Sequence, residues 1–436
     1  MNASIEKRTI KKVGWRLIPL MLVCYLVNYL DRINVGFAAL HMNEDVGITA
    51  TVFGWGAGLF FISYFLCEVP SNLALHRVGA RRWIARIMVS WGIVSTCFAF
   101  VQGPTSFLIL RFLLGVAEAG FFPGMVLYIS YWFPREYRGR LTALFMTAIP
   151  LSALIGAPLS GWLLETANFW DVASWKWMFI IEGVPAIFLG IIVLVYLTDK
   201  PSQAKWLTDE EKQWLISKLA VEQTPSHLSS LGDALKSLNV MLMAIVHLGF
   251  AVGSYAIAIW LPQMLKGHGL QTVEIGLLSM IPYAVAIAGM IVWGAVSDRS
   301  ANRSLHVAAS CLLGAVGLII TAAVPSLTGA IVGISISTLG VIAARPIFWT
   351  LPGSFLTGTA AAGGIAFINA FGNLGGFVGP YVIGVLKDQT GSFTTGIIAT
   401  SLPLLLSVVA ALILAKRLAP AKAVCAPEVN KPVQQH

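Results

Sequence analysis

The sequence predicts an all-α membrane protein, with twelve transmembrane helices arranged as two six-helix bundles. The prediction comes from an apolar composition, evenly spaced apolar runs and a one-sided distribution of basic residues. Hydrophobic residues make up 57% of the 436 positions, and charged residues only 11%. A water-soluble chain carries about a quarter of its residues as charges. A soluble globular fold is therefore excluded, and the lipid bilayer is the expected surrounding.

Apolar runs of the length needed to cross a bilayer, about 20 residues, occur twelve times. Their expected ranges are 16–40, 53–75, 83–101, 107–131, 141–164, 177–198, 240–265, 273–296, 304–324, 328–350, 360–386 and 393–416. The run from 360 is interrupted by glycines, and the loop before it is almost free of charge. Eleven and thirteen spans are therefore the alternative counts.

Basic residues predict the orientation of these spans. If the N-terminus is cytoplasmic, 23 of the 29 Lys and Arg face the cytoplasm and three face outward; the three within spans are Arg32, Arg111 and Arg345. Such a bias follows the positive-inside rule, so both termini are expected to be cytoplasmic. The rule also accounts for the net charge of +9 without a nucleic-acid partner.

A polar stretch between the sixth and seventh runs divides the chain into halves. The expected segments are a cytoplasmic N-tail (1–15), a first bundle (16–198), a cytoplasmic linker (199–239), a second bundle (240–417) and a disordered cytoplasmic tail (418–436). In the linker, Thr208 and Glu211 have the spacing of a capping box, which predicts the start of a short amphipathic helix at the inner membrane surface.

Four ionisable residues of the first half are expected at bilayer depth, where a charge costs about 3 kcal/mol unless it is paired or hydrated. Asp31 and Arg32 are adjacent and point about 100° apart on a helix. Arg111 and Glu118 are seven residues apart, so they share one helix face with a drift of about 20°. The alternatives are a snorkelling pair for the first two and a static bridge between helices for the second two.

A fixed cation together with a protonatable acid is what proton-coupled transport of an anion requires. An arginine stays charged and attracts a carboxylate, whereas a carboxyl group takes up and releases a proton. We therefore expect these four groups to share a water-lined cavity midway through the membrane.

Other polar residues in the spans lie in the second half. Arg345 in the tenth run and Asn369 and Asn373 in the eleventh are candidates for substrate binding, with glycines around the asparagines that allow close helix packing. His247 is expected to have a packing role with its polar atoms satisfied, and Glu68 to be interfacial. No catalytic triad, metal-ligand cluster or cofactor motif is present, so we expect no enzyme activity, no metal and no cofactor.

A repeated cytoplasmic element gives the first family resemblance. Gly294-x-x-x-Asp298-Arg299, followed by Arg303, resembles the loop motif of the major facilitator superfamily, and a degraded copy occurs around Arg77 and Arg81 in the first half. Residues 134–140, which include Arg138, resemble the other cytoplasmic gate element of that family. The resemblance implies the major facilitator fold. It also implies a gating role for these residues, which are Arg77, Arg81, Asp298, Arg299 and Arg138.

Several further stretches resemble the anion:cation symporter family, and its bacterial tartrate-type organic acid transporters most of all. They are residues 28–34, 68–72, 111–123, 348–352 and 369–376. The resemblance implies that Asp31 and Glu118 carry protons, that Arg32 binds the substrate carboxylate and that Arg111 tunes Glu118. It also implies a substrate cavity lined by Tyr29, Tyr64, Trp349 and Asn369.

The sequence thus predicts a multi-pass protein of a bacterial inner membrane that imports a small organic acid anion, such as tartrate or a related sugar acid, with protons. A uniporter or exchanger of an aromatic or other carboxylate, without net proton coupling, is the alternative. The expected partners are the anion, protons and the lipid bilayer, and the expected state is a monomer. The identity of the acid stays open.

Overall fold

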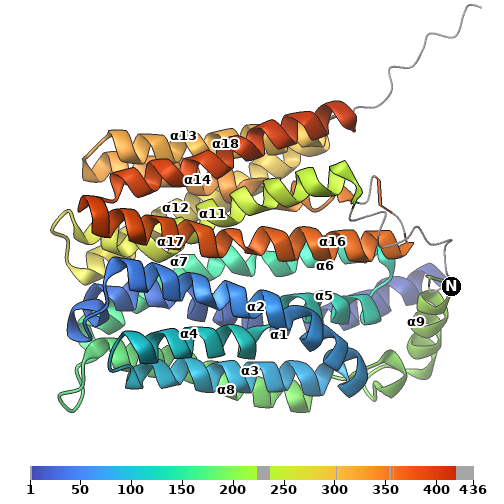
Figure 1. The fold of residues 1–436 in the computed structure, drawn as a ribbon. Helices are drawn as coiled ribbons and strands as arrows, with labels where there is room; N and C mark the ends of the chain where they lie inside the picture. The colour runs from blue at the N-terminus through green and yellow to red at the C-terminus, as the bar shows by residue number, and fades with distance from the viewer. Residues whose placement is uncertain (1, 223–235, 301, 353–354, 357, 419–436) are drawn as a thin grey trace, which may run out of the picture.

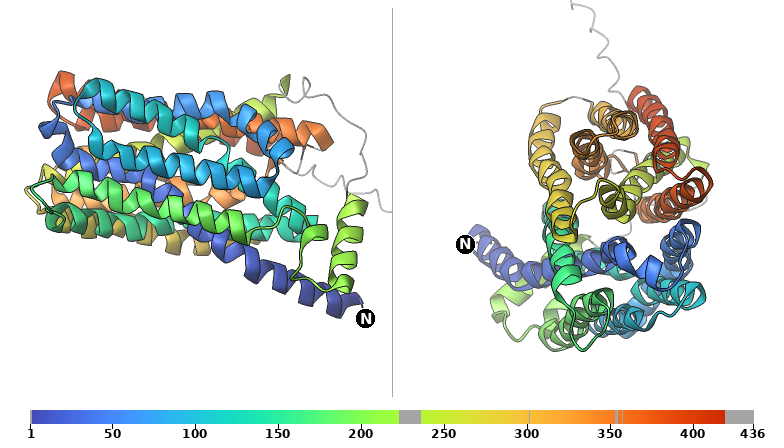
Figure 2. Two further views of the ribbon diagram at one scale, coloured as in Figure 1. Left: turned by 90° about the horizontal axis from the view of Figure 1, so that it is seen from below. Right: turned by 90° about the vertical axis from the view of Figure 1, so that its left-hand side faces the viewer.

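The computed structural model describes residues 2–222, 236–300, 302–352, 355–356 and 358–418, and in these residues every regular element is helical. Viewed along the helices, two groups of spans lie side by side (Figure 2, right), the first half in blue to green and the second in yellow to red. Twelve helical stretches of the described chain are long and apolar enough to cross a membrane, which confirms the expected count.

The first half consists of six spans, two of which contain a break. Its helices are α1 (Asn2–Asp45), α2 (Ala50–Val78), α3 (Ala80–Cys97), α4 (Pro104–Glu118), α5 (Phe121–Trp132), α6 (Arg135–Met146), α7 (Ala148–Thr166) and α8 (Ser174–Tyr196). Helices α4 and α5 form the fourth span, and α6 and α7 form the fifth.

The second half repeats this plan after the linker helix α9 (Asp209–Glu222). Its helices are α11 (Leu238–Lys266), α12 (Thr272–Asp298), α13 (Arg303–Ala323), α14 (Leu327–Ala343), α15 (Arg345–Phe348), α16 (Gly358–Asn373), α17 (Gly375–Thr390) and α18 (Thr394–Arg417). Helices α14 and α15 form the tenth span, and α16 and α17 the eleventh.

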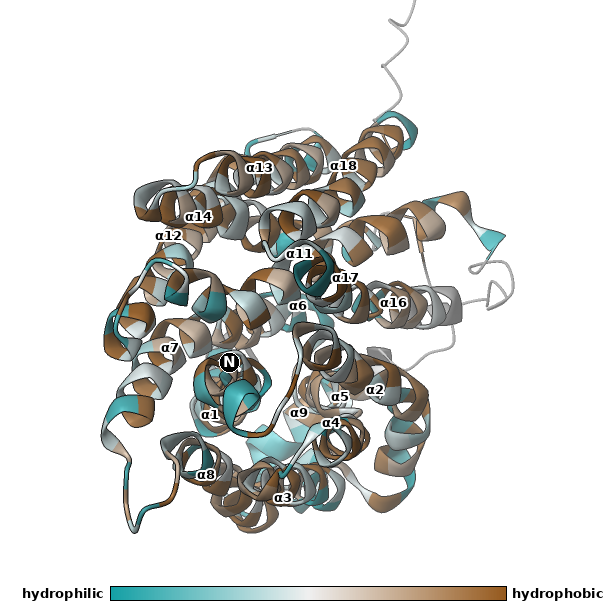
Figure 3. Ribbon diagram, turned by 60° about the vertical axis from the view of Figure 1, so that its left-hand side comes forward, coloured by the Kyte–Doolittle hydropathy of each residue, from teal (hydrophilic) through white to brown (hydrophobic). Residues whose placement is uncertain are grey.

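The outer faces of the helices are apolar. Large hydrophobic side chains such as Leu66, Val195 and Leu402 are exposed, and brown apolar positions cover much of the ribbon in Figure 3. Lipid solvates such faces, while the backbone hydrogen bonds are satisfied within each helix. Helix α11 is the exception, because 89% of the residues in its apolar 18-residue stretch are buried, compared with 33–61% in the corresponding stretches of the other spans. It therefore lies at the centre of the molecule.

The fourth and tenth spans are each interrupted next to a charged residue. Helix α4 ends at Glu118, and Gly120 takes a left-handed conformation (φ 87°) that lets α5 begin in a new direction. Helix α14 ends at Ala343, and α15 begins at Arg345. The sequence predicted one continuous helix in each case, since an apolar pattern does not reveal such a break. Discontinuous helices are common where transporters bind substrate.

The halves are joined mainly at the end of the molecule that lies away from α9 (Figure 1). We call this end the distal end, and the opposite end, where α9 lies, the α9 end. At the distal end the Asp388 carboxylate accepts hydrogen bonds from the N–H groups of Ala50 (3.2 Å) and Thr51 (2.7 Å), at the first turn of α2. Glu165 of α7 accepts one from the N–H of Val273 (3.1 Å), at the start of α12. A carboxylate from each half thus caps a helix of the other half.

The linker helix packs on an extension of the first span. The capping box is confirmed, because the N–H of Glu211 donates to Thr208 Oγ1 (3.3 Å) and the N–H of Thr208 donates to Glu211 Oε2 (3.0 Å). The Glu211 carboxylate also pairs with Arg8 (3.1 Å) and Lys12 (2.9 Å). Helix α1 already begins at Asn2, so the segment expected as an N-tail continues the first helix. Residues 223–235 of the linker and 419–436 of the expected disordered tail lie outside the described residues.

Candidate functional site

The Arg32 side chain lies at the centre of the molecule, between the two halves. Its Nε donates to Glu118 Oε1 in a close ion pair, and its Nη1 donates to the hydroxyl of Tyr255 (3.1 Å) on α11. The Arg32 side chain is 10% exposed and the Glu118 side chain is fully buried. A fixed cation and a protonatable acid are therefore in direct contact, and the cation also reaches the second half.

Aromatic rings lie close to the Arg32 guanidinium of this ion pair. The Arg32 guanidinium lies 5.3 Å from the ring centre of Phe60 and 5.1 Å from that of Tyr64, both on α2. The Tyr29 ring is buried and lies 6.4 Å from the ring of Tyr255. Of the expected cavity residues, Tyr64 thus contacts the central cation directly, and Tyr29 lies at the boundary of the halves.

Arg111 is buried inside the first half. Its Nε donates to the carbonyl of Gly56 (3.1 Å) and its Nη2 to that of Ala57 (3.2 Å), both on α2. Its guanidinium lies 5.1 Å from the ring centre of Phe60, the ring that Arg32 also faces. The helical spacing correctly places Arg111 and Glu118 on the same helix, but Arg32 is the residue that forms the ion pair with Glu118.

Asp31 points away from the centre, toward α3. Its carboxylate accepts hydrogen bonds from the indole N–H of Trp91 (2.7 Å) and the hydroxyl of Ser95 (3.1 Å). Asp31 is 1% exposed, and within the described residues no Lys or Arg forms an ion pair with it. Both of its hydrogen-bond donors are neutral. Asp31 and Arg111 are thus enclosed by the first half, whereas the sequence led us to expect all four groups around one water-lined cavity.

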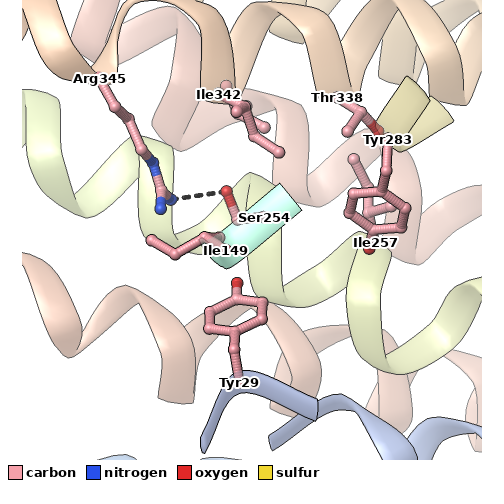
Figure 4. A pocket seen from close by; sticks show the side chains of 9 residues that line it. Tyr29, Ile149, Ser254, Ile257, Tyr283, Thr338, Ile342 and Arg345 are labelled. Atoms are coloured by element: carbon pink, nitrogen blue, oxygen red, sulfur yellow. Dashed lines mark hydrogen bonds between the residues drawn. The ribbon is translucent and has the colours of Figure 1, made fainter. Parts of the chain in front are cut away.

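Arg345 faces a small pocket between the halves (Figure 4). The pocket is lined by Tyr29, Ile149, Ser254, Ile257, Tyr283, Thr338, Val341, Ile342 and Arg345. Its free volume is about 10 Å³, which is room for about one water molecule. Arg345 Nη2 donates to Ser254 Oγ (2.7 Å) and to the carbonyl of Phe250 (3.2 Å), both on α11.

Asn369 joins the second half to Glu68, an acid expected at the membrane interface. Its Nδ2 donates to Glu68 Oε1 (3.0 Å) across the boundary between α16 and α2. Glu68 is 7% exposed, and its second oxygen is buried without a partner. One signal was available in the sequence, because Glu68 follows Tyr64 by four residues and so lies on the same helix face. Asn373, at the end of α16, is partly exposed.

Trp349 lies next to His247 at the second-half side of the centre. The two rings are 5.1 Å apart, and His247 also stacks on Phe348 at 5.6 Å. His247 thus packs among aromatic rings as expected, but neither of its ring nitrogens has a hydrogen-bond partner. The expectation that its polar atoms are satisfied does not hold.

The residues expected to gate lie in loops and helix ends at the α9 end. Arg77 and Arg299 are exposed. The backbone N–H of Arg81 donates to Asp199 Oδ1 (2.8 Å), and Arg138 Nε donates to the carbonyl of Phe133 (2.7 Å). These two contacts lie within the first half and the start of the linker. The side chain of Asp298 lies outside the described residues.

Comparison with known proteins identifies the family. The model of the Major Facilitator Superfamily matches residues 21–380. The chain belongs to the major facilitator superfamily. Two proteins of Agrobacterium vitis, each named "Putative tartrate transporter", are similar to it. One is 50% identical and covers 95% of this chain and 92% of that protein; the other is 48% identical, with 95% and 96% covered. The inner membrane transport protein RhmT of Escherichia coli is 38% identical, with 87% and 89% covered.

Solved structures of the superfamily share the fold. A crystal structure of the D-xylose-proton symporter has a TM-score of 0.73 at 16% identity, and covers 93% of this chain and 98% of that one. A bacterial homologue of the human lysosomal transporter Spinster has a TM-score of 0.74 at 14% identity, with the same coverage. This major facilitator protein is therefore a membrane transporter and not an enzyme, and it is a multi-pass protein of the bacterial inner membrane.

Proposed function

We propose that this transporter is a proton-coupled symporter that imports a small organic acid anion, such as tartrate or a related sugar acid, by alternating access. The observation that carries the proposal is the contact of Arg32 with Glu118 on one side and with Tyr255 of the other half on the other. The tartrate transporter names of the two relatives from Agrobacterium vitis support the class of substrate.

The ion pair supplies a physical route for coupling. While Glu118 is ionised, it neutralises Arg32, and a substrate carboxylate has to compete with it. Protonation of Glu118 removes this competitor and leaves Arg32 a buried cation without a counter-charge. Such a cation is costly in the membrane, and a carboxylate from the substrate restores the pairing. Proton binding therefore favours substrate binding, and proton release re-forms the ion pair and expels the anion.

Asp31 is the second proposed proton site. Trp91 and Ser95 donate to its carboxylate, but neither carries a charge. Its ionised form is therefore a buried anion that is hydrogen-bonded but not neutralised, and a proton removes that charge. Because Asp31 and Arg32 are adjacent on α1, a backbone shift that follows proton binding at Asp31 also moves Arg32. Arg111, which ties α4 to α2, holds the phenyl ring of Phe60 against Arg32 and thereby positions the site.

The proposed orientation places the α9 end in the cytoplasm, together with both termini and the linker 199–239, and the distal end outside. The basic residues near α9 support it by the positive-inside rule. Transport then consists of rocking of the bundle 16–198 against the bundle 240–417. We propose that Arg77, Arg81, Arg138, Asp298 and Arg299 take part in closing the cytoplasmic end. The bond between Glu68 and Asn369 links the halves between this end and the central ion pair.

The test is uptake by proteoliposomes that contain the purified transporter. An inward proton gradient should drive accumulation of labelled tartrate, and addition of tartrate without a gradient should make the external medium more alkaline. Control vesicles carry the Arg32→Gln variant. Accumulation that follows the substrate gradient alone, with no change in external pH, would instead establish a uniporter or exchanger.

A further inference from the structure

We propose that Arg345 forms a second carboxylate-binding site across from Arg32, so that the substrate is a dicarboxylate held between the two halves. The inference rests on the proposed function and names the substrate class of the same site. Its starting point is the unbalanced charge of Arg345 in the described structure.

Arg345 is a cation within a membrane span, and among the described residues it has no anionic partner. Its two hydrogen bonds go to neutral acceptors, Ser254 Oγ and the carbonyl of Phe250. Its Nε is buried without a hydrogen-bond partner, and no carboxylate of the described residues lies within ion-pair distance of its guanidinium. Arg32, in contrast, has Glu118. A buried cation is stable when an anion with matching hydrogen-bond geometry satisfies it, so the missing partner of Arg345 is an anion.

Both cations donate to neighbouring residues of the same helix, α11. Arg32 donates to Tyr255 and Arg345 donates to Ser254, and neighbouring residues of a helix differ by about 1.5 Å along its axis. Figure 4 shows that Arg345 and Tyr29 approach the space around Ser254 from opposite sides. Because Arg32 is three residues after Tyr29 on α1, one face of the first half presents both the tyrosine and the cation toward α11.

The two halves also supply charged groups at equivalent places. Glu118 ends the first segment of the fourth span, and Arg345 begins the second segment of the tenth span, which is the fourth span of its own half. Both charges therefore lie at breaks in related discontinuous helices. One break provides the acid that competes for Arg32, and the other provides a cation that pairs with no carboxylate of the described residues.

A dicarboxylate fits this arrangement better than a monocarboxylate. One carboxylate takes the place of Glu118 on Arg32, and the second neutralises Arg345. While Glu118 is protonated, a monocarboxylate leaves one of the two cations unpaired. The pocket has a free volume of only about 10 Å³, so the halves have to part before the ligand enters. A ligand that then binds a cation from each half stabilises the state in which the halves close around it.

The experiment measures equilibrium binding by isothermal titration calorimetry at about pH 7, where both carboxylates of the ligand are ionised. The ligands are tartrate, malate and succinate, and the monoamide of each, which keeps the shape and removes one charge. The wild-type protein should bind at least one diacid about 10- to 100-fold more tightly than its monoamide. Arg345→Gln should bind the diacid as weakly as the monoamide, and should leave monoamide binding unchanged.

Two variants complete the design. Arg345→Lys keeps the charge without the planar fork, and should retain part of the preference for the diacid. Thr321→Val removes a buried hydroxyl on α13 that does not line this pocket, and should retain all of it. Thermal unfolding of each variant verifies that it is folded.

The outcomes separate the two proposals. Equal weakening of diacid and monoamide in Arg345→Gln, or a preference that survives in this folded variant, overturns the dicarboxylate inference. Equally tight binding of both ligands by the wild-type protein overturns it too, while the proposed function stands. If the wild-type protein binds no carboxylate at all, the proposed function fails and the inference fails with it.

Discussion

Arg32 forms its ion pair with Glu118, although the two residues are 86 positions apart in the sequence. Spacing along the fourth span suggests Arg111 as the cation that acts with Glu118, because the two share a helix face. Arg111 instead binds the backbone of α2. The acid of the fourth span thus pairs with the cation of the first span, and this cation is also the one that reaches α11.

Replacement of Arg32 should weaken substrate binding even when the charge is kept. Arg32→Lys loses the geometry that joins Glu118 and Tyr255 at once, and substrate affinity should fall by about 10- to 100-fold. Tyr255→Phe removes one neutral hydrogen bond and should weaken binding by about 2- to 12-fold. Calorimetry on the purified variants measures both effects. Equal affinities of Arg32→Lys and the wild-type protein would exclude Arg32 as the carboxylate-binding residue.

Asp31→Asn should reduce the number of protons that move with each substrate. The amide oxygen keeps an acceptor for Trp91 or Ser95, so the fold is expected to survive, but the side chain no longer binds a proton. The ratio of proton to substrate flux is obtained from the membrane potential at which net transport stops. Ser95→Ala serves as the control, because it removes a hydrogen bond to Asp31 and leaves the carboxyl group in place. An unchanged ratio in Asp31→Asn would remove Asp31 from the coupling mechanism.

The two carboxylates that cap helices across the distal end should hold that end closed. Asp388→Ala and Glu165→Ala each remove a cap from a helix of the other half, and should destabilise the closed form by about 0.5–2 kcal/mol. Spin labels at Trp170 and Ser392, in distal loops of different halves, report the separation as a distance distribution. Both variants should shift it to longer distances.

Glu274→Ala is a matched control for this experiment. Glu274 lies at the same end, but its carboxylate accepts from the N–H of Gln271 and so caps its own helix (2.9 Å). Its removal weakens α12 without removing a bond between the halves. A shift as large as that in Asp388→Ala would mean that general loss of helix stability, and not loss of the bridging caps, opens the distal end.

The contact between the linker helix and α1 should be lost in acid. Burial raises the pKa of Glu211, but the hydrogen bond from Lys12, the bond with Thr208 and the positive charges of Lys12 and Arg8 outweigh it and lower the pKa overall. For a carboxyl with a lowered pKa, the stabilising contribution is present above the unfolded value of about 4.3. It is lost as the pH falls through the folded value.

Limited proteolysis measures this contact, with an acid-active protease in the acid range and a neutral protease at neutral pH. Cleavage in the linker should rise as the pH falls below about 4, and Glu211→Gln should be cleaved faster than the wild-type protein even at neutral pH. Glu210→Gln is the control, because Glu210 is largely exposed and, within the described part of the chain, forms an ion pair with Arg8 only. Equal protection of the wild-type protein and Glu211→Gln at neutral pH would exclude a role for Glu211 in docking the linker.

The sequence was sufficient for the fold because the bilayer imposes simple rules on length and charge. Twelve apolar runs, a central polar linker and the capping box at Thr208 all reappear in the structure. The breaks at Gly120 and Ala344 were not predictable from apolar pattern, since both flanking segments are apolar and helical. These two breaks nevertheless determine where Glu118 and Arg345 lie, because α4 ends at Glu118 and α15 begins at Arg345.

Side-chain contacts between different helices could not be predicted from a single sequence. Adjacency predicts that Asp31 and Arg32 diverge, and they do, but it does not say that one meets Trp91 and the other Glu118. The position of Glu68 in the second run suggests a residue at the membrane interface. In the structure, Asn369 donates a hydrogen bond to it across the boundary of the halves. Such pairings depend on how two bundles dock, which no local pattern encodes.

Glu118→Gln tests the coupling of proton and substrate most directly, when net uptake and exchange are measured on the same proteoliposomes. A glutamine keeps the size of the side chain but cannot release a proton. The account predicts that uptake driven by a pH gradient is lost, while exchange of labelled for unlabelled substrate continues because Arg32 remains available. Gradient-driven uptake at the wild-type rate in Glu118→Gln would contradict it.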